Sequence, residues 1–178
     1  SLDGYFVDVN GDMTWAHNNN KDEEWDAFVA GNAGGGGMLL FGRKTYELMV
    51  NYWPTPMALK NDPVVARGMN EASKVVFSRT LDKAMWNNTR LVKGNVAAEV
   101  RKMKQATGPG MAILGSGSII AQLAPEHLID EYQVVIIPVV LGEGRTMFEG
   151  VKARLPLKTI KTRTFANGNV LLCYEPVV

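Results

Sequence analysis

Short apolar runs alternate along the chain with longer segments in which apolar residues recur at helical spacing. Continuous apolar runs that end in glycine or polar turn residues are typical of strands buried on both faces of a sheet. Apolar residues three or four positions apart, bounded by capping residues, proline or glycine, indicate helices. The pattern predicts strands over residues 38–41, 74–78, 89–92, 111–114 and 129–137, and helices over residues 22–33, 43–52, 63–72, 96–106 and 119–123.

The C-terminal end of the chain carries a hairpin signal. Residues 157–165 and 170–175 read as two strands, and Asn167-Gly168 between them is a favoured two-residue turn. Residues 3–21 are rich in Asn, Gly and Asp, so we expect a long loop there. Together these elements predict a single α/β domain over residues 1–178, with a mostly parallel central sheet and a C-terminal antiparallel hairpin.

The composition is that of an ordinary globular domain, with 46% hydrophobic and 21% charged residues. A formal net charge of +1 provides no global field to draw the chain to nucleic acid or to an anionic membrane, so we expect neither as a partner. The longest apolar run, residues 134–141, is far shorter than the about 18 residues of a membrane span. The single cysteine excludes an intrachain disulfide and suits a reducing cytoplasm. With only two histidines besides, the sequence argues against a metal site.

Polar segments suited to phosphate follow three of the predicted strands. Open α/β sheets bind ligands beyond the carboxyl ends of their strands, where such segments would meet. The first is Gly42-Arg43-Lys44-Thr45. It opens a predicted helix, whose free N–H groups and partial positive charge favour phosphate, and Arg43 adds a fork of donors. A tight glycine turn with solvated basic residues is the alternative interpretation.

The second segment is Ser78-Arg79-Thr80 and the third is Gly115-Ser116-Gly117-Ser118. A serine and an arginine at a strand end can hold the 2′-phosphate that distinguishes NADP from NAD, or can form a simple polar turn. Glycines let the backbone approach a pyrophosphate closely, although a turn needed only for packing would also use them. Ile120 stands where the dinucleotide fingerprint G-x-G-x-x-G has its third glycine, and no Gly-Lys-Ser/Thr follows. The sequence therefore argues against the ordinary Rossmann and P-loop interpretations.

These segments, in this order, resemble the dihydrofolate reductase-like superfamily. Leu40 to Glu47 resembles its strand-Gly-Arg-x-Thr-aromatic-Glu motif, and Val75 to Arg79 is similar to the strand that ends at the adenosine phosphate. Ile113 to Ser118 resembles the glycine turn beneath the pyrophosphate. Ser1 to Phe6 and Pro138 to Gly144 resemble segments of the riboflavin-biosynthesis reductase domain, which points to stand-alone relatives of that domain.

The resemblance implies a three-layer dihydrofolate reductase-like fold, a homodimer and an NADPH-dependent reductase. It further implies hydride transfer to a small-molecule substrate that is pterin-like or pyrimidine-like, such as a riboflavin precursor. Superfamily members carry a strand before the segment that resembles Ser1 to Phe6, so we expect a native strand ahead of Ser1. The riboflavin reductases also carry a Thr-x-x-x-Asp-x-Pro pattern, and the stretch Thr45 to Val50 departs from it, which leaves the substrate open.

Candidates for the substrate end are the acids Asp3 and Asp22, as catalytic residues, and Trp15, as a substrate contact. The acid that holds the pterin in dihydrofolate reductase stands shortly before a Trp-Phe pair, and Asp22 is the nearest match, with Glu23 or Asp26 as alternatives. Crowded acids at a helix start also favour the helix dipole without any catalytic role. Asp3 lies in the loop that flanks the nicotinamide in the resembling families, although an Asp-Gly turn explains it as well. Trp15 could cover the substrate ring or anchor its loop to the core.

Two other classes of function stay open. No acid stands out as the proton donor, so a nucleotide-binding module without turnover is one alternative. A dimeric interaction protein that retains the fold is the other.

Overall fold

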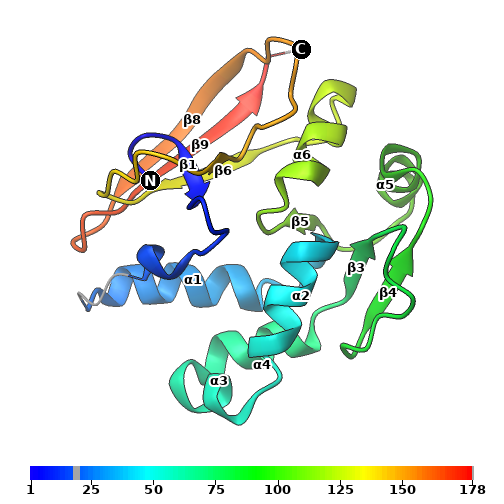
Figure 1. The fold of residues 1–178 in the computed structure, drawn as a ribbon, viewed down its shortest axis with the longest axis horizontal. Coiled ribbons are helices and arrows are strands. Elements are labelled where there is room, and N and C mark those ends of the chain that lie inside the picture. The colour runs from blue at the N-terminus through cyan, green and yellow to red at the C-terminus, as the bar shows by residue number, and fades with distance from the viewer. Residues whose placement is uncertain (18–20, 178) are drawn as a thin grey trace. The chain divides into compact units, whose positions relative to one another are not determined.

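The computed structural model describes residues 1–17 and 21–177. The chain forms two compact units, which are drawn in Figure 1. The terminal unit combines Ser1–Trp25 with Ile120–Val178, and the central unit is Asp26–Ile119. The single domain expected over residues 1–178 stays a prediction. Within the described ranges, no helix has both the length and the apolar character that crossing a membrane demands.

The central unit is built on a four-stranded sheet with strand order β4-β3-β2-β5, and every neighbouring pair is parallel. β2 and β3 lie inside this sheet and are almost wholly buried, which is why their sequences are continuous apolar runs. The sheet therefore confirms the predicted α/β class. Its strands are β2 (Met38–Gly42), β3 (Lys74–Phe77), β4 (Thr89–Val92) and β5 (Met111–Ile113).

Helices form two of the three connections between strands of the central sheet. Three of them lie between β2 and β3, and α5 links β4 to β5. The side chain of Asn95 caps α5 by accepting the N–H of Ala98 at 2.9 Å, as the sequence predicts. A helix over residues 56–61 was not predicted, because a six-residue helix that begins at a proline is too short to show a helical period. The helices are α2 (Arg43–Tyr52), α3 (Pro56–Asn61), α4 (Pro63–Glu71), α5 (Val96–Gln105) and α6 (Gly117–Leu123), the last of which runs into the terminal unit.

A buried lysine closes the C-terminal end of α4. The Lys74 side chain donates to the carbonyl oxygens of Met69 (2.8 Å), Asn70 (3.1 Å) and Ala72 (2.6 Å), and its Nζ lies 4.6 Å from the ring centre of Trp86. A helix leaves its last carbonyls without partners, so the ammonium group satisfies them. Burial lowers the pKa of Lys74 to about 8. The lysine fixes the first residue of β3 against α4.

The terminal unit contains two antiparallel sheets. The larger has strand order β6-β9-β8, and its β8–β9 hairpin turns at Asn167-Gly168, which confirms the predicted hairpin. The smaller pairs β1 with β7. The long loop expected over residues 3–21 was therefore wrong for residues 5–7, whose three-residue run is too short to show alternation. The strands are β1 (Tyr5–Val7), β6 (Tyr132–Ile136), β7 (Arg145–Thr146), β8 (Leu157–Thr164) and β9 (Val170–Pro176).

Helix α1 (Glu23–Gly34) begins in the terminal unit and continues into the central one. Two 3-10 turns, η1 (Thr14–Ala16) and η2 (Ala124–Glu126), complete the described elements. In the terminal unit the ring of Trp25, in the first turn of α1, packs edge-on against Phe165 with ring centres 5.1 Å apart. This aromatic contact places the start of α1 beside the β8–β9 hairpin.

Candidate functional site

Three polar segments meet at the carboxyl edge of the central sheet. β3, β2 and β5 are consecutive parallel neighbours, so the residues that follow them leave the sheet at the same edge. These residues belong to the three segments predicted from the sequence as a phosphate site, which begin at Ser78, Gly42 and Gly115. The structure thus brings the three predicted segments together.

Helix α2 starts at this edge without a capping side chain. Gly42 is its N-cap residue and, having no side chain, makes no capping hydrogen bond of its own. The first turn contains no acidic residue, while the exposed cations Arg43 and Lys44 occupy its first two positions. A carboxylate at a helix start normally offsets the positive end of the dipole, and here the first turn provides none. Such a helix start favours an external anion.

Gly42 is also required by the close approach of the third segment. A Cβ atom at Gly42 would lie 3.3 Å from Oγ of Ser118 and 3.5 Å from a side-chain carbon of Ile119. The glycine therefore lets the segments after β2 and β5 lie against each other.

Ser116 joins these two segments by hydrogen bonds. Its Oγ accepts the N–H of Gly42 at 2.9 Å and donates to Oγ1 of Thr45 at 2.8 Å. Ser116 is buried and has a φ of +64°, next to Gly115 with a φ of +62°. The Ser116 hydroxyl is thus engaged inside the protein, whereas the sequence alone suggested a direct cofactor contact.

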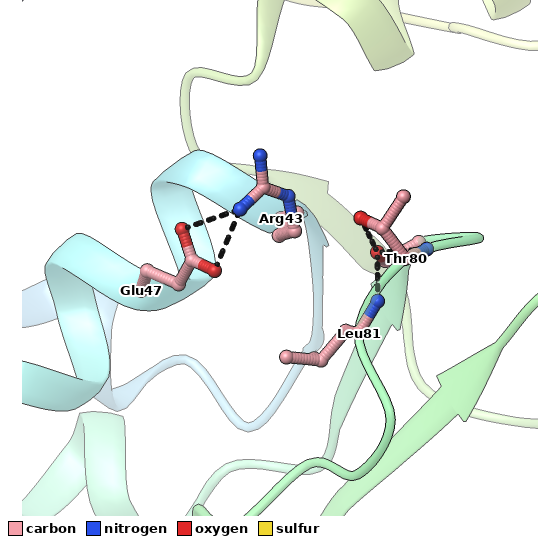
Figure 2. Close-up of polar contacts among 5 residues, drawn as sticks. Arg43, Glu47, Thr80 and Leu81 are labelled. Atoms are coloured by element: carbon pink, nitrogen blue, oxygen red, sulfur yellow. Dashed lines mark hydrogen bonds and ion pairs between the residues drawn. The ribbon is translucent and has the colours of Figure 1, made fainter.

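Figure 2 draws Arg43, at the start of α2, and Thr80, in the turn after the neighbouring strand β3. Nη1 of Arg43 pairs with both carboxylate oxygens of Glu47, one turn further along α2, at 3.0 and 3.3 Å. Oγ of Ser78 accepts the N–H groups of Thr80 at 3.2 Å and Leu81 at 2.9 Å, so the serine shapes the turn after β3. In Figure 2 the other terminal nitrogen of the Arg43 guanidinium points away from Glu47. That side of the fork can therefore receive a ligand while Glu47 holds the other.

One further cation belongs to the same edge. Lys93 follows β4, the strand beside β3, and the N–H of Ser78 donates to the carbonyl of Val92 at 3.0 Å. The strand itself was predicted, but an apolar run does not tell which strand will be its neighbour. The signal that could have found Lys93 is its place directly after a predicted strand, shared with Gly42 and Ser78.

Asp3 holds together two segments of the terminal unit. Its carboxylate oxygens accept the N–H of Leu141 at 3.2 and 3.1 Å and the N–H of Gly142 at 2.7 Å. The Ser1 side chain and these backbone groups lower the pKa of Asp3 to about 2. A carboxylic acid with that pKa is ionised near neutral pH, so the geometry favours anchoring over proton donation.

Asp22 caps α1 and joins it to the hairpin. Oδ1 accepts the N–H groups of Glu24 (3.0 Å) and Trp25 (3.1 Å), and Oδ2 accepts the N–H of Asn167 at 3.0 Å. The bond from Asn167 is the largest of the contacts that lower the pKa of this buried carboxyl. The structure therefore gives Asp22 a supporting role, and its catalytic role stays a prediction.

Trp15 lies in η1, where it is half-buried and donates its indole N–H to the carbonyl of Asp12 at 3.1 Å. The alternative acids Glu23 and Asp26 are exposed on α1. Asp3, Trp15 and Asp22 all belong to the terminal unit, whereas every cofactor candidate belongs to the central unit.

The chain is similar to proteins of known sequence. A family model described as the RibD C-terminal domain matches residues 1–171. The uncharacterized protein YyaP of Bacillus subtilis is 32% identical over 175 residues, which cover 98% of this chain and 90% of that protein. The uncharacterized protein YwjB of the same organism is 24% identical over 168 residues, covering 94% and 89%.

Solved structures share the fold. A putative riboflavin biosynthesis protein from Shewanella sp. PV-4 matches with a TM-score of 0.74 at 22% identity, covering 99% of this chain and 94% of that one. A pyrimidine reductase-like protein from Corynebacterium diphtheriae matches with a TM-score of 0.63 at 13% identity, covering 100% and 89%. At these identities the likeness establishes the fold, and together with the family model it confirms the dihydrofolate reductase-like fold expected from the motifs.

Proposed function

Because this chain belongs to the RibD C-terminal domain family, we propose that it is an NADPH-dependent reductase. The observation that supports the proposal most is the sheet edge where α2 begins. There a helix start with a glycine N-cap and no first-turn acid lies at the same sheet edge as a glycine turn and a serine turn from the two neighbouring strands.

The chemistry of this edge fits a phosphorylated dinucleotide. The first-turn N–H groups of α2, with Lys44 and Thr45, suit a pyrophosphate, and the turn at residues 115–118 gives room for close approach. The exposed residues Arg43 and Arg79, which follow the neighbouring strands β2 and β3, suit the 2′-phosphate. When bound, NADPH supplies a hydride, and the residues of this chain bind and orient it.

The proposed substrate is a small pyrimidine-like or pterin-like molecule. The similar structures are described as a riboflavin biosynthesis protein and as pyrimidine reductase-like, which supports the pyrimidine class. Asp3, Trp15 and Asp22 are the proposed substrate-side residues. Because hydrogen bonds from the Ser1 side chain and backbone groups lower the pKa of Asp3, and backbone hydrogen bonds lower that of Asp22, we assign both acids orientation of substrate or water and leave proton donation to solvent.

A two-stage assay tests the proposal. The purified chain is titrated with NADPH and with NADH while tryptophan fluorescence is followed, and cofactor absorbance is then recorded after addition of a pyrimidine precursor or dihydrofolate. Tighter binding of NADPH followed by its oxidation supports the reductase. Binding of NADPH without its oxidation by either compound favours a nucleotide-binding module, and no binding of either cofactor overturns the proposal.

Replacing Arg43 sharpens the cofactor assignment. Arg43→Ala should weaken NADPH binding more than NADH binding, by about 1–3 kcal/mol, because one charge-assisted contact to the 2′-phosphate is lost. Arg79→Ala should act in the same direction. Arg67→Ala, which removes an exposed arginine from α4, is the matched control and should leave both affinities unchanged. Equal losses for the two cofactors would contradict the 2′-phosphate role.

A further inference from the structure

We propose that Ser116 is a positioning residue of the nucleotide site, acting through α2 without touching the cofactor. This inference rests on the proposed function. Ser116 lies in the turn after β5, and its hydroxyl reaches Gly42 and Thr45, which stand 74 and 71 positions earlier in the chain. The turn after β5 thereby supplies the start of α2 with the polar side chain that Gly42 lacks.

The hydrogen bonds at Ser116 have a definite direction. The backbone N–H of Gly42 can only donate, so Oγ of Ser116 accepts there at 2.9 Å. The hydroxyl proton of Ser116 then goes to Oγ1 of Thr45 at 2.8 Å. The Thr45 hydroxyl, as acceptor of that bond, keeps its own proton for another acceptor. A chain of this kind strengthens its last donor by polarisation.

The last donor stands where the proposed anion would bind. Thr45 is the third residue of α2, so its hydroxyl lies in the helix turn with unpaired N–H groups and without acids. In this arrangement, Ser116 sets the direction of the Thr45 proton and holds the start of α2 in place. The Thr45 hydroxyl donates a hydrogen bond to the anion, and Ser116 acts through Thr45 without contacting the anion.

The backbone conformation of Ser116 gives a second, independent observation. Its φ of +64° lies in the left-handed region, which residues with a Cβ adopt at a cost and glycine adopts freely. The residue is only 6% exposed, and its hydroxyl makes both bonds. A residue that keeps such a conformation needs an offsetting interaction, and the bridge between the two segments provides it.

Two substitutions at Ser116 separate cofactor binding from stability. Ser116→Ala and Ser116→Gly both remove the hydroxyl, but only Ser116→Gly also removes the Cβ atom that disfavours the left-handed backbone. We expect both variants to bind NADPH about 5-fold to 10-fold more weakly than the unaltered chain, by equal factors. We expect Ser116→Gly to melt at a higher temperature than Ser116→Ala. The affinity would then follow the hydroxyl and the melting temperature would follow the backbone.

Thr45→Val tests the other end of the hydrogen-bond chain. This variant should also lose about 5-fold to 10-fold in NADPH affinity, and the double variant with Ser116→Gly should lose little more, because one chain of bonds is broken in each case. Thr89→Val is the matched control, since it removes a half-buried hydroxyl at the amino end of β4, opposite the site. Its NADPH affinity should stay within about 2-fold of the unaltered chain.

The dissociation constants come from fluorescence titration of the full chain, and the melting temperatures come from thermal unfolding. Wild-type NADPH affinity in Ser116→Gly overturns the positioning role. Affinity losses that follow the melting temperatures of the two Ser116 variants overturn it as well, since they indicate a merely structural residue. Failure of the unaltered chain to bind NADPH overturns the proposed function instead.

Discussion

The central and terminal units use their polar groups in opposite ways. In the central unit, buried apolar strands carry the sheet, and cations and hydroxyls gather at its carboxyl edge around a helix start without first-turn acids. In the terminal unit, the carboxylates of Asp3 and Asp22 bind backbone N–H groups of residues 138 to 145 positions away. The difference teaches that a charged residue is a strong ligand candidate where the protein leaves part of its hydrogen-bonding capacity unused, as on the side of the Arg43 guanidinium that points away from Glu47.

The largest effect is expected where backbone meets backbone in the terminal unit. A Cβ atom at Gly144 would lie 2.2 Å from the carbonyl oxygen of Val7, so Gly144→Ala forces β1 and β7 apart. We expect it to lower the free energy of unfolding by about 3 kcal/mol, measured by urea denaturation.

The control for this substitution is Gly11→Ala. Gly11 also has a positive φ, of +81°, but a Cβ atom added there would meet no other atom within 4 Å. It should therefore cost only the left-handed strain, about 1 kcal/mol. Equal losses of unfolding free energy in the two variants would show that the tight pairing of β1 with β7 contributes nothing to stability. That result would weaken the contrast between the two units.

The buried lysine tests whether the central unit depends on polar groups inside as well as at its edge. Lys74→Met leaves three carbonyl oxygens at the end of α4, one buried and two partly buried, without their donor. We expect a loss of about 2–3 kcal/mol in the free energy of unfolding. Lys83→Met, at an exposed position, should change it by less than about 0.5 kcal/mol. If Lys74→Met left the free energy of unfolding unchanged, apolar burial alone would stabilise the central unit.

The smallest effect is expected at Asp3, because its carboxylate is exposed. Its folded-state pKa of about 2 lies below the ordinary 3.8, so its stabilising contribution is complete above pH 3.8 and is lost as pH falls through 2. Asp3→Asn should therefore be less stable than the unaltered chain near neutral pH, with the gap closing toward pH 2. Acid unfolding curves of the two proteins measure this gap. A gap that is independent of pH would contradict the anchoring role.

The elements of the central unit other than α3 were predictable because their apolar signals are uniform. β4 and α2 have the bounds that the sequence predicts, residues 89–92 and 43–52. The terminal unit was harder, because β1 and β7 have three and two residues and depend on backbone pairing that leaves no periodic trace. Strand β6 is likewise shorter than predicted. It covers Tyr132–Ile136, so residues 129–131 and 137 of the predicted strand lie outside it.

The residues at the candidate site were predictable by type and order, but their contacts were not. The pattern of strands and turns predicted that Gly42, Ser78 and Gly115 would follow neighbouring strands. The bridge from Ser116 depends on a left-handed backbone angle, which no residue type except glycine signals. The capping role of Asp22 depends on Asn167, 145 positions away. The expected homodimer and the strand expected ahead of Ser1 stay predictions.

A nuclear magnetic resonance titration with NADPH tests the central claim most directly. The account predicts that the largest backbone amide shifts cluster in residues 42–45, 78–80 and 115–118, and that they are smaller with NADH in residues 78–80. Large shifts confined to the terminal unit, with these three segments unchanged, would contradict the nucleotide site at the carboxyl edge of the central sheet.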